Sequence, residues 1–172
     1  MLSKYMRTLG IMSTLLVVAC QQTPDALTSV RVEPHFQYLN TPVFEDGTAI
    51  TFKATITSPN DLQQIYTDGH YHYGHFYCPI NDQLEAKGSL SFDQHAPNQQ
   101  THAPFKHKVL FEICAINDYS QTQCIHQLQQ AKTLPEQLNC TITFGKMFGG
   151  RKLIAHHIHM DFNQLEHATP SE

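Results

Sequence analysis

The chain has 172 residues, and its 15 aspartates and glutamates outnumber its 11 lysines and arginines, for a formal net charge of −4. A nucleic-acid-binding domain needs a basic face to meet phosphates, so this balance argues against nucleic acid as a partner and against a polybasic membrane patch. The length suits a single domain.

The N-terminus has the pattern of a secretory signal. Lys4 and Arg7 precede an apolar stretch over residues 9–19, which is shorter than the roughly 20 residues that a transmembrane helix needs. The stretch ends in LVVAC at 16–20, which resembles the lipobox of bacterial lipoproteins. The alternative is an ordinary signal peptide with a chance cysteine.

The lipobox resemblance implies that residues 1–19 are removed and that Cys20 carries lipid on its sulfur and on its new amino terminus. Several acyl chains anchor a protein far more firmly than one. In such lipoproteins an Asp after the lipidated Cys often retains the protein in the inner membrane, and Gln21 stands there instead. We therefore expect an outer-membrane lipid anchor, a tether over 20–29, and a periplasmic or surface-exposed domain.

Alternating apolar and polar residues predict strands through the rest of the chain. The segment 31–38 is predicted as an edge strand because of Pro34, and residues 48–57 as the clearest strand. Further strands are expected from Gln64 through Cys78 and at 88–92, 105–116, 122–128, 140–144 and 152–162. The last two form a hairpin around GKMFGG. A helical turn is expected within 127–138, turns at 45–47, 79–82 and 117–120, and a polar loop over 93–104.

Many short alternating strands separated by turns predict an all-β fold, an antiparallel β-sandwich over residues 30–165 with a frayed tail at 166–172. The segments VFEDGTAITFKATITSP (43–59) and FKHKVLFEICAINDYSQTQC (105–124) resemble bacterial immunoglobulin-like modules. That resemblance implies an immunoglobulin-like sandwich, to which the 140–162 hairpin is an addition.

Four cysteines remain beyond Cys20, and an even number in an exported domain predicts two disulfides. Cys114 and Cys124 flank one turn, so they are expected to face each other across a hairpin. Cys78 and Cys140 would then pair, which would bring the histidine-rich stretch HYHYGHFYC (70–78) beside IAHHIHMDF (154–162). The alternative is that the thiols are free.

The two histidine-rich stretches are candidate metal sites. Residues i and i+2 of a strand share a face, and imidazole suits Zn²⁺ and Cu²⁺. A bulge at Gly74 would turn His75 to the same face as His70 and His72. The candidate ligands are His70, His72, His75, His157, His159 and Asp161. The alternative is a solvated face that carries histidines without metal or other cofactor.

The aromatic residues of the first stretch, Tyr71, Tyr73, Phe76 and Tyr77, are expected to pack in the core; exposed together, they would indicate a partner or carbohydrate site. GxSxG, HExxH and phosphate-loop motifs are absent from the sequence. We therefore expect a non-enzymatic lipoprotein that binds a protein or another envelope component. The alternative is a periplasmic Zn- or Cu-binding lipoprotein.

Overall fold

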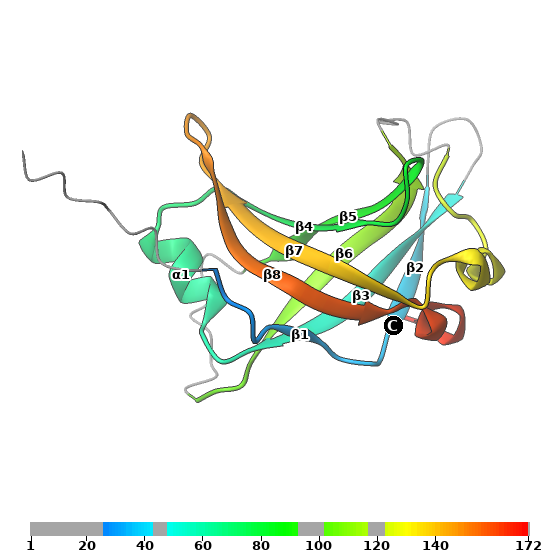
Figure 1. Cartoon of the computed structure of the whole chain (residues 1–172), viewed down its shortest axis with the longest axis horizontal. Coiled ribbons are helices and arrows are strands. Elements are labelled where there is room, and N and C mark those ends of the chain that lie inside the picture. The colour runs from blue at the N-terminus through cyan, green and yellow to red at the C-terminus, as the bar shows by residue number, and fades with distance from the viewer. Residues whose placement is uncertain (1–25, 43–47, 93–101, 117–122, 172) are drawn as a thin grey trace, which may run out of the picture.

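The computed structural model describes residues 26–42, 48–92, 102–116 and 123–171, and most of them lie in one large β-sheet (Figure 1). The predicted signal peptide, Cys20 and the turns predicted at 45–47 and 117–120 lie outside the described residues, as does most of the loop predicted at 93–104. The strands are β1 (Arg31–Val32), β2 (Gln37–Pro42), β3 (Thr48–Ser58), β4 (Tyr73–Pro79), β5 (Leu84–Ser91), β6 (Phe105–Ala115), β7 (Gln137–Gly145), β8 (Arg151–Asp161) and β9 (Thr169–Pro170).

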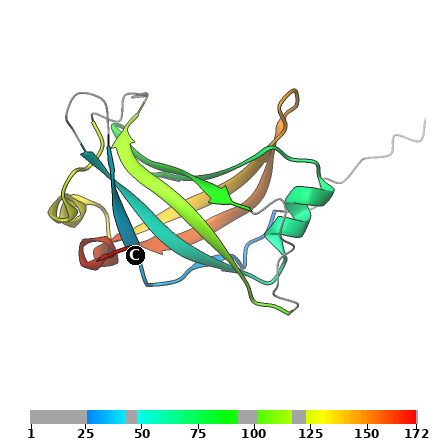
Figure 2. The same ribbon diagram turned by 180° about the vertical axis from the view of Figure 1, so that it is seen from behind.

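The strands follow the order β8-β7-β4-β5-β6-β3-β2-β9, and β1 also pairs with β3. All pairings between strands are antiparallel except the short β2–β9 pair. The sheet twists and curls so that its two halves face each other (Figures 1 and 2). The all-β, sandwich-like fold with an added C-terminal hairpin, β7–β8, is therefore confirmed.

One apolar core fills the space between the two halves. Its largest side chains include Phe52, Phe76, Phe111 and Phe144, each at most 1% exposed. Phe111 lies at the centre, with the rings of Phe52 and Phe76 centred 5.4 and 5.7 Å away. Aromatic side chains bury the most apolar area per residue, so this cluster supplies a large share of the stability.

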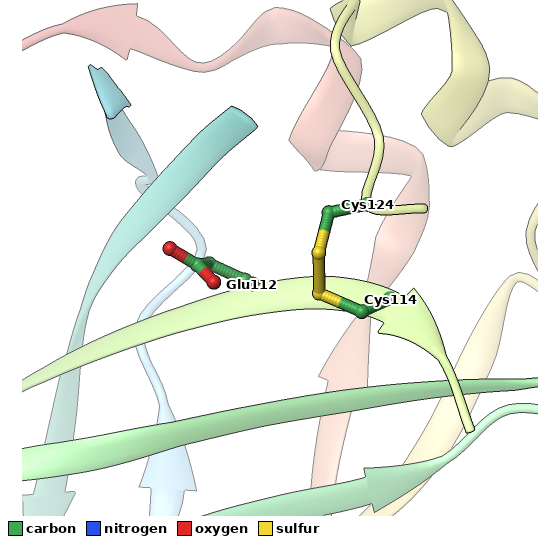
Figure 3. A group of neighbouring side chains, drawn as sticks. All are labelled: Glu112, Cys114 and Cys124. Carbon is green, nitrogen blue, oxygen red and sulfur yellow. A yellow bond between two sulfur atoms is a disulfide. The ribbon is translucent and has the colours of Figure 1, made fainter. Parts of the chain in front are cut away.

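The two disulfides join the pairs that the sequence predicts, Cys78 with Cys140 and Cys114 with Cys124. Cys78 continues the register in which Tyr77 faces Thr141, so the first bridge ties β4 to β7. The second links the end of β6 to the returning chain (Figure 3). The described residues of the segment predicted as a strand over 122–128 form no regular strand. They pair with the sheet through the Cys114–Cys124 contact and through the backbone of Ile125, which forms hydrogen bonds with both β3 and β6.

Residues predicted to begin the strand of the HYHYGHFYC stretch form a helix instead, α1 (Leu62–Asp68). Asp61 caps the helix by accepting hydrogen bonds from the amides of Gln63 and Gln64. Leu62 and Tyr66 are buried one turn apart on its inner face. A capped first turn with an i, i+4 apolar pair favours helix over strand, so β4 begins only at Tyr73.

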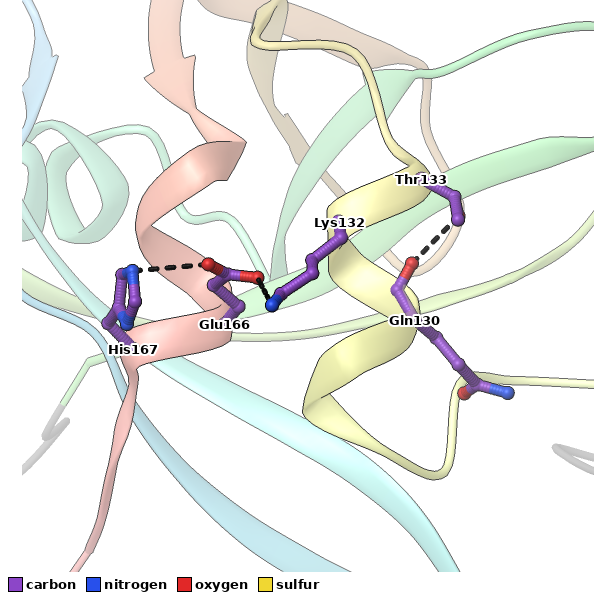
Figure 4. Close-up of polar contacts among 5 residues, drawn as sticks. All are labelled: Gln130, Lys132, Thr133, Glu166 and His167. Carbon is purple, nitrogen blue, oxygen red and sulfur yellow. Dashed lines mark hydrogen bonds and ion pairs between the residues drawn. The ribbon is translucent and has the colours of Figure 1, made fainter.

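The tail is ordered, and the prediction that 166–172 is frayed is wrong for residues 166–171. The 3₁₀ helices η1 (Leu128–Thr133) and η2 (Phe162–His167) lie side by side, and Glu166 of η2 pairs with Lys132 of η1 at 3.3 Å (Figure 4). Leu165 is fully buried, and β9 pairs with β2. Burial of apolar residues therefore extends the domain beyond residue 165.

The last residues of the tether predicted over 20–29 belong to the folded domain. The amide of Leu27 donates to the Ile154 carbonyl at 2.8 Å, and the amide of His156 donates to the Leu27 carbonyl at 3.1 Å. Val30 is buried, and β1 then pairs with β3. Residues 27–32 therefore bridge the two edges of the curled sheet and are part of the fold.

Candidate functional site: a groove on the outer face of the sheet

The stretch HYHYGHFYC crosses from a turn into β4, and its strand residues alternate between the two faces of the sheet. Gly74, Phe76 and Cys78 point into the core and are buried. The outward positions between them hold Tyr73, His75 and Tyr77, and Tyr77 is 39% exposed. The prediction of core packing is therefore right for Phe76 and wrong for Tyr77, because the two occupy opposite faces of one strand.

Beside these outward residues lies a groove of about 590 Å³, built across the four neighbouring strands β8, β7, β4 and β5. The register sets Tyr77 of β4 opposite Lys87 of β5 on one side and opposite Thr141 of β7 on the other. His75 likewise faces Thr143. The polar lining of the groove comprises His75, Tyr77, Glu85, Lys87, Thr141, Thr143 and Arg151.

Two cationic side chains and one carboxylate set the electrostatics of the groove. Lys87 lies 3.5 Å from Glu85, and Arg151 lines the groove beside His75. The pKa of His75 is lowered, first by its burial and second by the positive charge of Arg151. The imidazole is therefore neutral near pH 7 and offers both a donor and an acceptor.

The chemistry of the groove suits recognition. It combines a tyrosine ring and hydroxyl, two threonine hydroxyls, a neutral imidazole and charged ends of both signs. These groups orient a polar ligand through hydrogen bonds, and the ring contributes apolar contact. Tyrosine in particular adds rigid amphipathic contact area to binding surfaces.

The six predicted metal ligands are not brought together. The Cys78–Cys140 bridge ties β4 to β7, and β7 separates β4 from β8 in the sheet. Strands two positions apart lie roughly 10 Å from each other, beyond the reach of one ion. His70 and His72 are exposed before β4, and His75 lies in the groove.

The local geometry on β8 also differs from the prediction. The β4–β7 register is regular through Gly74, so no bulge turns His75 toward the other histidines. The bulge lies on β8 instead, where His157 has a φ of 54°. His157 and His159 are exposed, and the carboxylate of Asp161 accepts a hydrogen bond from the amide of Asn163 at 3.0 Å. Asp161 therefore caps η2.

Among the described residues, three side chains do gather at the distances that a metal site needs: Glu112, Cys114 and Cys124 (Figure 3). The two cysteine sulfurs are joined in a disulfide, which leaves no thiolate to act as a ligand. Glu112 accepts a hydrogen bond from the Thr51 hydroxyl at 2.8 Å. This group is therefore structural.

Comparison with protein families, curated proteins and solved structures finds no match for this chain. Functional inference consequently depends on the groove and the sequence features themselves. Within the described part of the chain, no helix has the length and apolar character required to cross a bilayer.

Most groove residues are not predicted from the sequence. The other polar lining residues belong to no sequence motif, and only the pairings of β4 with β5 and β7, and of β7 with β8, make them neighbours: Glu85, Lys87, Thr141, Thr143 and Arg151. The alternation of residues in the HYHYGHFYC stretch is the sequence signal that identifies the outward-facing groove residues on β4. Since Phe76 and Cys78 belong inside, Tyr73, His75 and Tyr77 must face outward.

Proposed function

We propose that this chain is a non-enzymatic, lipid-anchored binding module of the bacterial envelope. Acylated Cys20 holds it at the outer membrane, and the groove on the outer face of β4, β5, β7 and the start of β8 recognises a partner. The basic start, the apolar stretch and LVVAC support the anchor. Two disulfides fit an oxidising compartment outside the cytosol.

The observation that carries the binding role is the composition of the groove. Its lining sets Lys87 and Arg151 against Glu85 alone, in a chain whose net charge is negative. Neutral His75 and exposed Tyr77 lie between these charges. This surface fits a polar or acidic segment of a protein partner, since cationic ends attract carboxylates and the ring supplies apolar contact.

The metal-binding alternative is not proposed, because His70, His72 and His75 lie before or on β4, whereas His157 and His159 lie on β8, on the far side of β7.

A photocrosslinking experiment in native cells tests the binding role. A photoreactive phenylalanine analogue at position 77 is expected to form an adduct with one envelope protein upon illumination. The matched control carries the same analogue at position 39, because Leu39 is 36% exposed and Tyr77 39% exposed, while Leu39 lies on β2 outside the groove. Equal adducts at both positions, or none at 77, would contradict the proposal.

Replacement of Tyr77 by alanine then measures the contribution of the ring to the captured complex. Truncation of a central aromatic residue of an interface typically costs about 2 kcal/mol, close to a thirtyfold loss of affinity. Leu39→Ala is expected to leave the affinity unchanged.

A further inference from the structure

The tip of the β7–β8 hairpin presents the most exposed apolar side chains of the described residues. Phe148 is 98% exposed and Met147 is 66% exposed, whereas the other large exposed hydrophobic residues stay below half exposure. Transfer of a large aromatic side chain from water into an apolar phase is favourable, so an exposed side chain of this kind gains free energy when a second phase buries it.

Basic residues surround this apolar tip. Residues 146–152, KMFGGRK, hold three of the nine lysines and arginines that follow Cys20, and they hold no aspartate or glutamate. An apolar apex flanked by cations matches the interface of a phospholipid bilayer, where apolar side chains reach the acyl boundary and cations meet phosphates. Three cations are fewer than a polybasic patch has, so the apolar residues supply most of the contact.

The base of the tip is held in place. The Tyr73 ring lies against Gly145, so close that a Cβ on that glycine would come within 2.0 Å of the ring. Lys146 places its ammonium 5.5 Å from the centre of the Tyr71 ring. The tip therefore projects from a packed support (Figure 1).

The direction of the chain at Leu27 limits how far the predicted anchor can lie from the tip. Leu27 pairs with Ala155 in parallel, and β8 runs away from the tip, so Ala26 precedes Leu27 on the side of the tip. Ala155 is four residues beyond Arg151, or about 13 Å along the strand. Seven residues from Cys20 to Leu27 span at most about 25 Å.

We infer that the tip formed by residues 146–152 inserts Met147 and Phe148 into the phospholipid bilayer that carries Cys20. The inference rests on the proposed lipid anchor. Attachment at Cys20 makes insertion an intramolecular event, so a weak contact is sufficient. Burial of one Phe or Met side chain shifts such an equilibrium by roughly tenfold to a hundredfold. Two points of contact fix the orientation of the domain on the membrane.

The test exploits the absence of tryptophan from the chain. Phe148→Trp creates a single fluorescent reporter at the tip, and Leu39→Trp places the matched control on β2, at the other end of the domain (Figure 1). The protein used is the chain from Cys20 to its end, which contains every described residue. Its four other cysteines form disulfides, so Cys20 is coupled selectively to a maleimide lipid in phosphatidylethanolamine–phosphatidylglycerol vesicles.

On attachment, the Phe148→Trp variant is expected to show a blue-shifted emission and to be quenched by lipids brominated on their acyl chains. The Leu39→Trp variant is expected to show neither. In the Phe148→Trp background, Lys152→Gln should lower the ratio of inserted to free tips about fivefold, since each basic residue near an anionic surface contributes about that factor. Lys108→Gln, which removes an exposed charge on β6, should not change it.

Emission from position 148 that stays as water-like and unquenched as that from position 39 would overturn the inference. Equal effects of Lys152→Gln and Lys108→Gln would remove the role of the basic residues at the tip. Chemical coupling imposes the attachment, so these outcomes are independent of whether cells acylate Cys20. That question is decided separately by the fractionation of cells that express the Cys20→Ala chain.

Discussion

Removal of the two disulfides is expected to destabilise the domain unequally. The Cys78–Cys140 bridge spans 62 residues and the Cys114–Cys124 bridge spans 10. In the chain-entropy description, a bridge restricts the unfolded chain by an amount that grows with the logarithm of the enclosed length. These separations correspond to about 4.3 and about 2.7 kcal/mol of unfolding free energy at 25 °C.

The comparison isolates this difference. Cys78, Cys114 and Cys140 are fully buried, and Cys124 is 4% exposed, so replacing either pair by alanine removes two sulfur atoms from a buried site. The packing loss is common to both double variants and largely cancels. The loss of the 78–140 bridge should therefore cost about 1.6 kcal/mol more than the loss of the 114–124 bridge.

Urea denaturation of the chain from residue 21, followed by circular dichroism, measures the two free energies. In thermal melts, the same difference corresponds to about 3–6 °C at this chain length. Equal losses, or a larger loss for the 114–124 variant, would refute the loop-length reasoning. Such a result would mean that local packing at the shorter bridge dominates.

Three further predictions concern a glycine, a histidine and the anchor. Gly88→Ala should lower the free energy of unfolding measured in urea by at least about 1–3 kcal/mol, because the added Cβ would lie 2.0 Å from the Leu110 carbonyl oxygen. Gly150→Ala is the control and should change the free energy of unfolding little, because nothing lies within 4 Å of a Cβ at that position. Burial lowers the pKa of His107, and the negative charge of Asp61 partly opposes this shift. The unfolded chain therefore binds a proton at this histidine more readily than the folded chain does. The free energy of unfolding should be highest above pH 6.5 and should decrease as the pH falls below 6.5. His107→Gln, which keeps an acceptor for the Leu62 amide, should flatten the melting temperature between pH 7 and 5, and an unchanged slope would contradict this origin. Cys20→Ala should move the protein from the membrane to the soluble fraction of fractionated cells, and continued membrane attachment would refute the lipid anchor.

Much of the fold follows from local patterns. Alternation over 48–57 and 105–116 predicts the strands found as β3 and β6, because a strand between core and solvent needs period 2. The disulfide pairing follows from the expected hairpin, which leaves Cys78 and Cys140 as partners. α1 carries a local signal as well: Asp61 followed by Leu62 and Tyr66 marks a capped helix.

The candidate site does not follow from local patterns, because it depends on the order of strands far apart in sequence. β7 follows β4 by more than 50 residues, yet it is its hydrogen-bonded neighbour, and this pairing places Thr141 beside Tyr77. The same order separates His75 of β4 from His159 of β8, so the six predicted ligands do not converge on one ion. Strand order results from burial summed over the whole core, which no single segment encodes.

The sequence alone predicts an export signal and lipidation at Cys20, and it predicts the strand periodicity and the disulfide partners, because each depends on a short segment or a simple count. Tertiary structure alone decides which side of each strand meets water and which strands adjoin. It therefore decides that Tyr77 lines a groove and that Phe148 stands exposed at the end of the domain where Leu27 enters the sheet. Side-chain exposure is a property of the assembled sheet, and a pattern of residues specifies it only after every strand has found its neighbour.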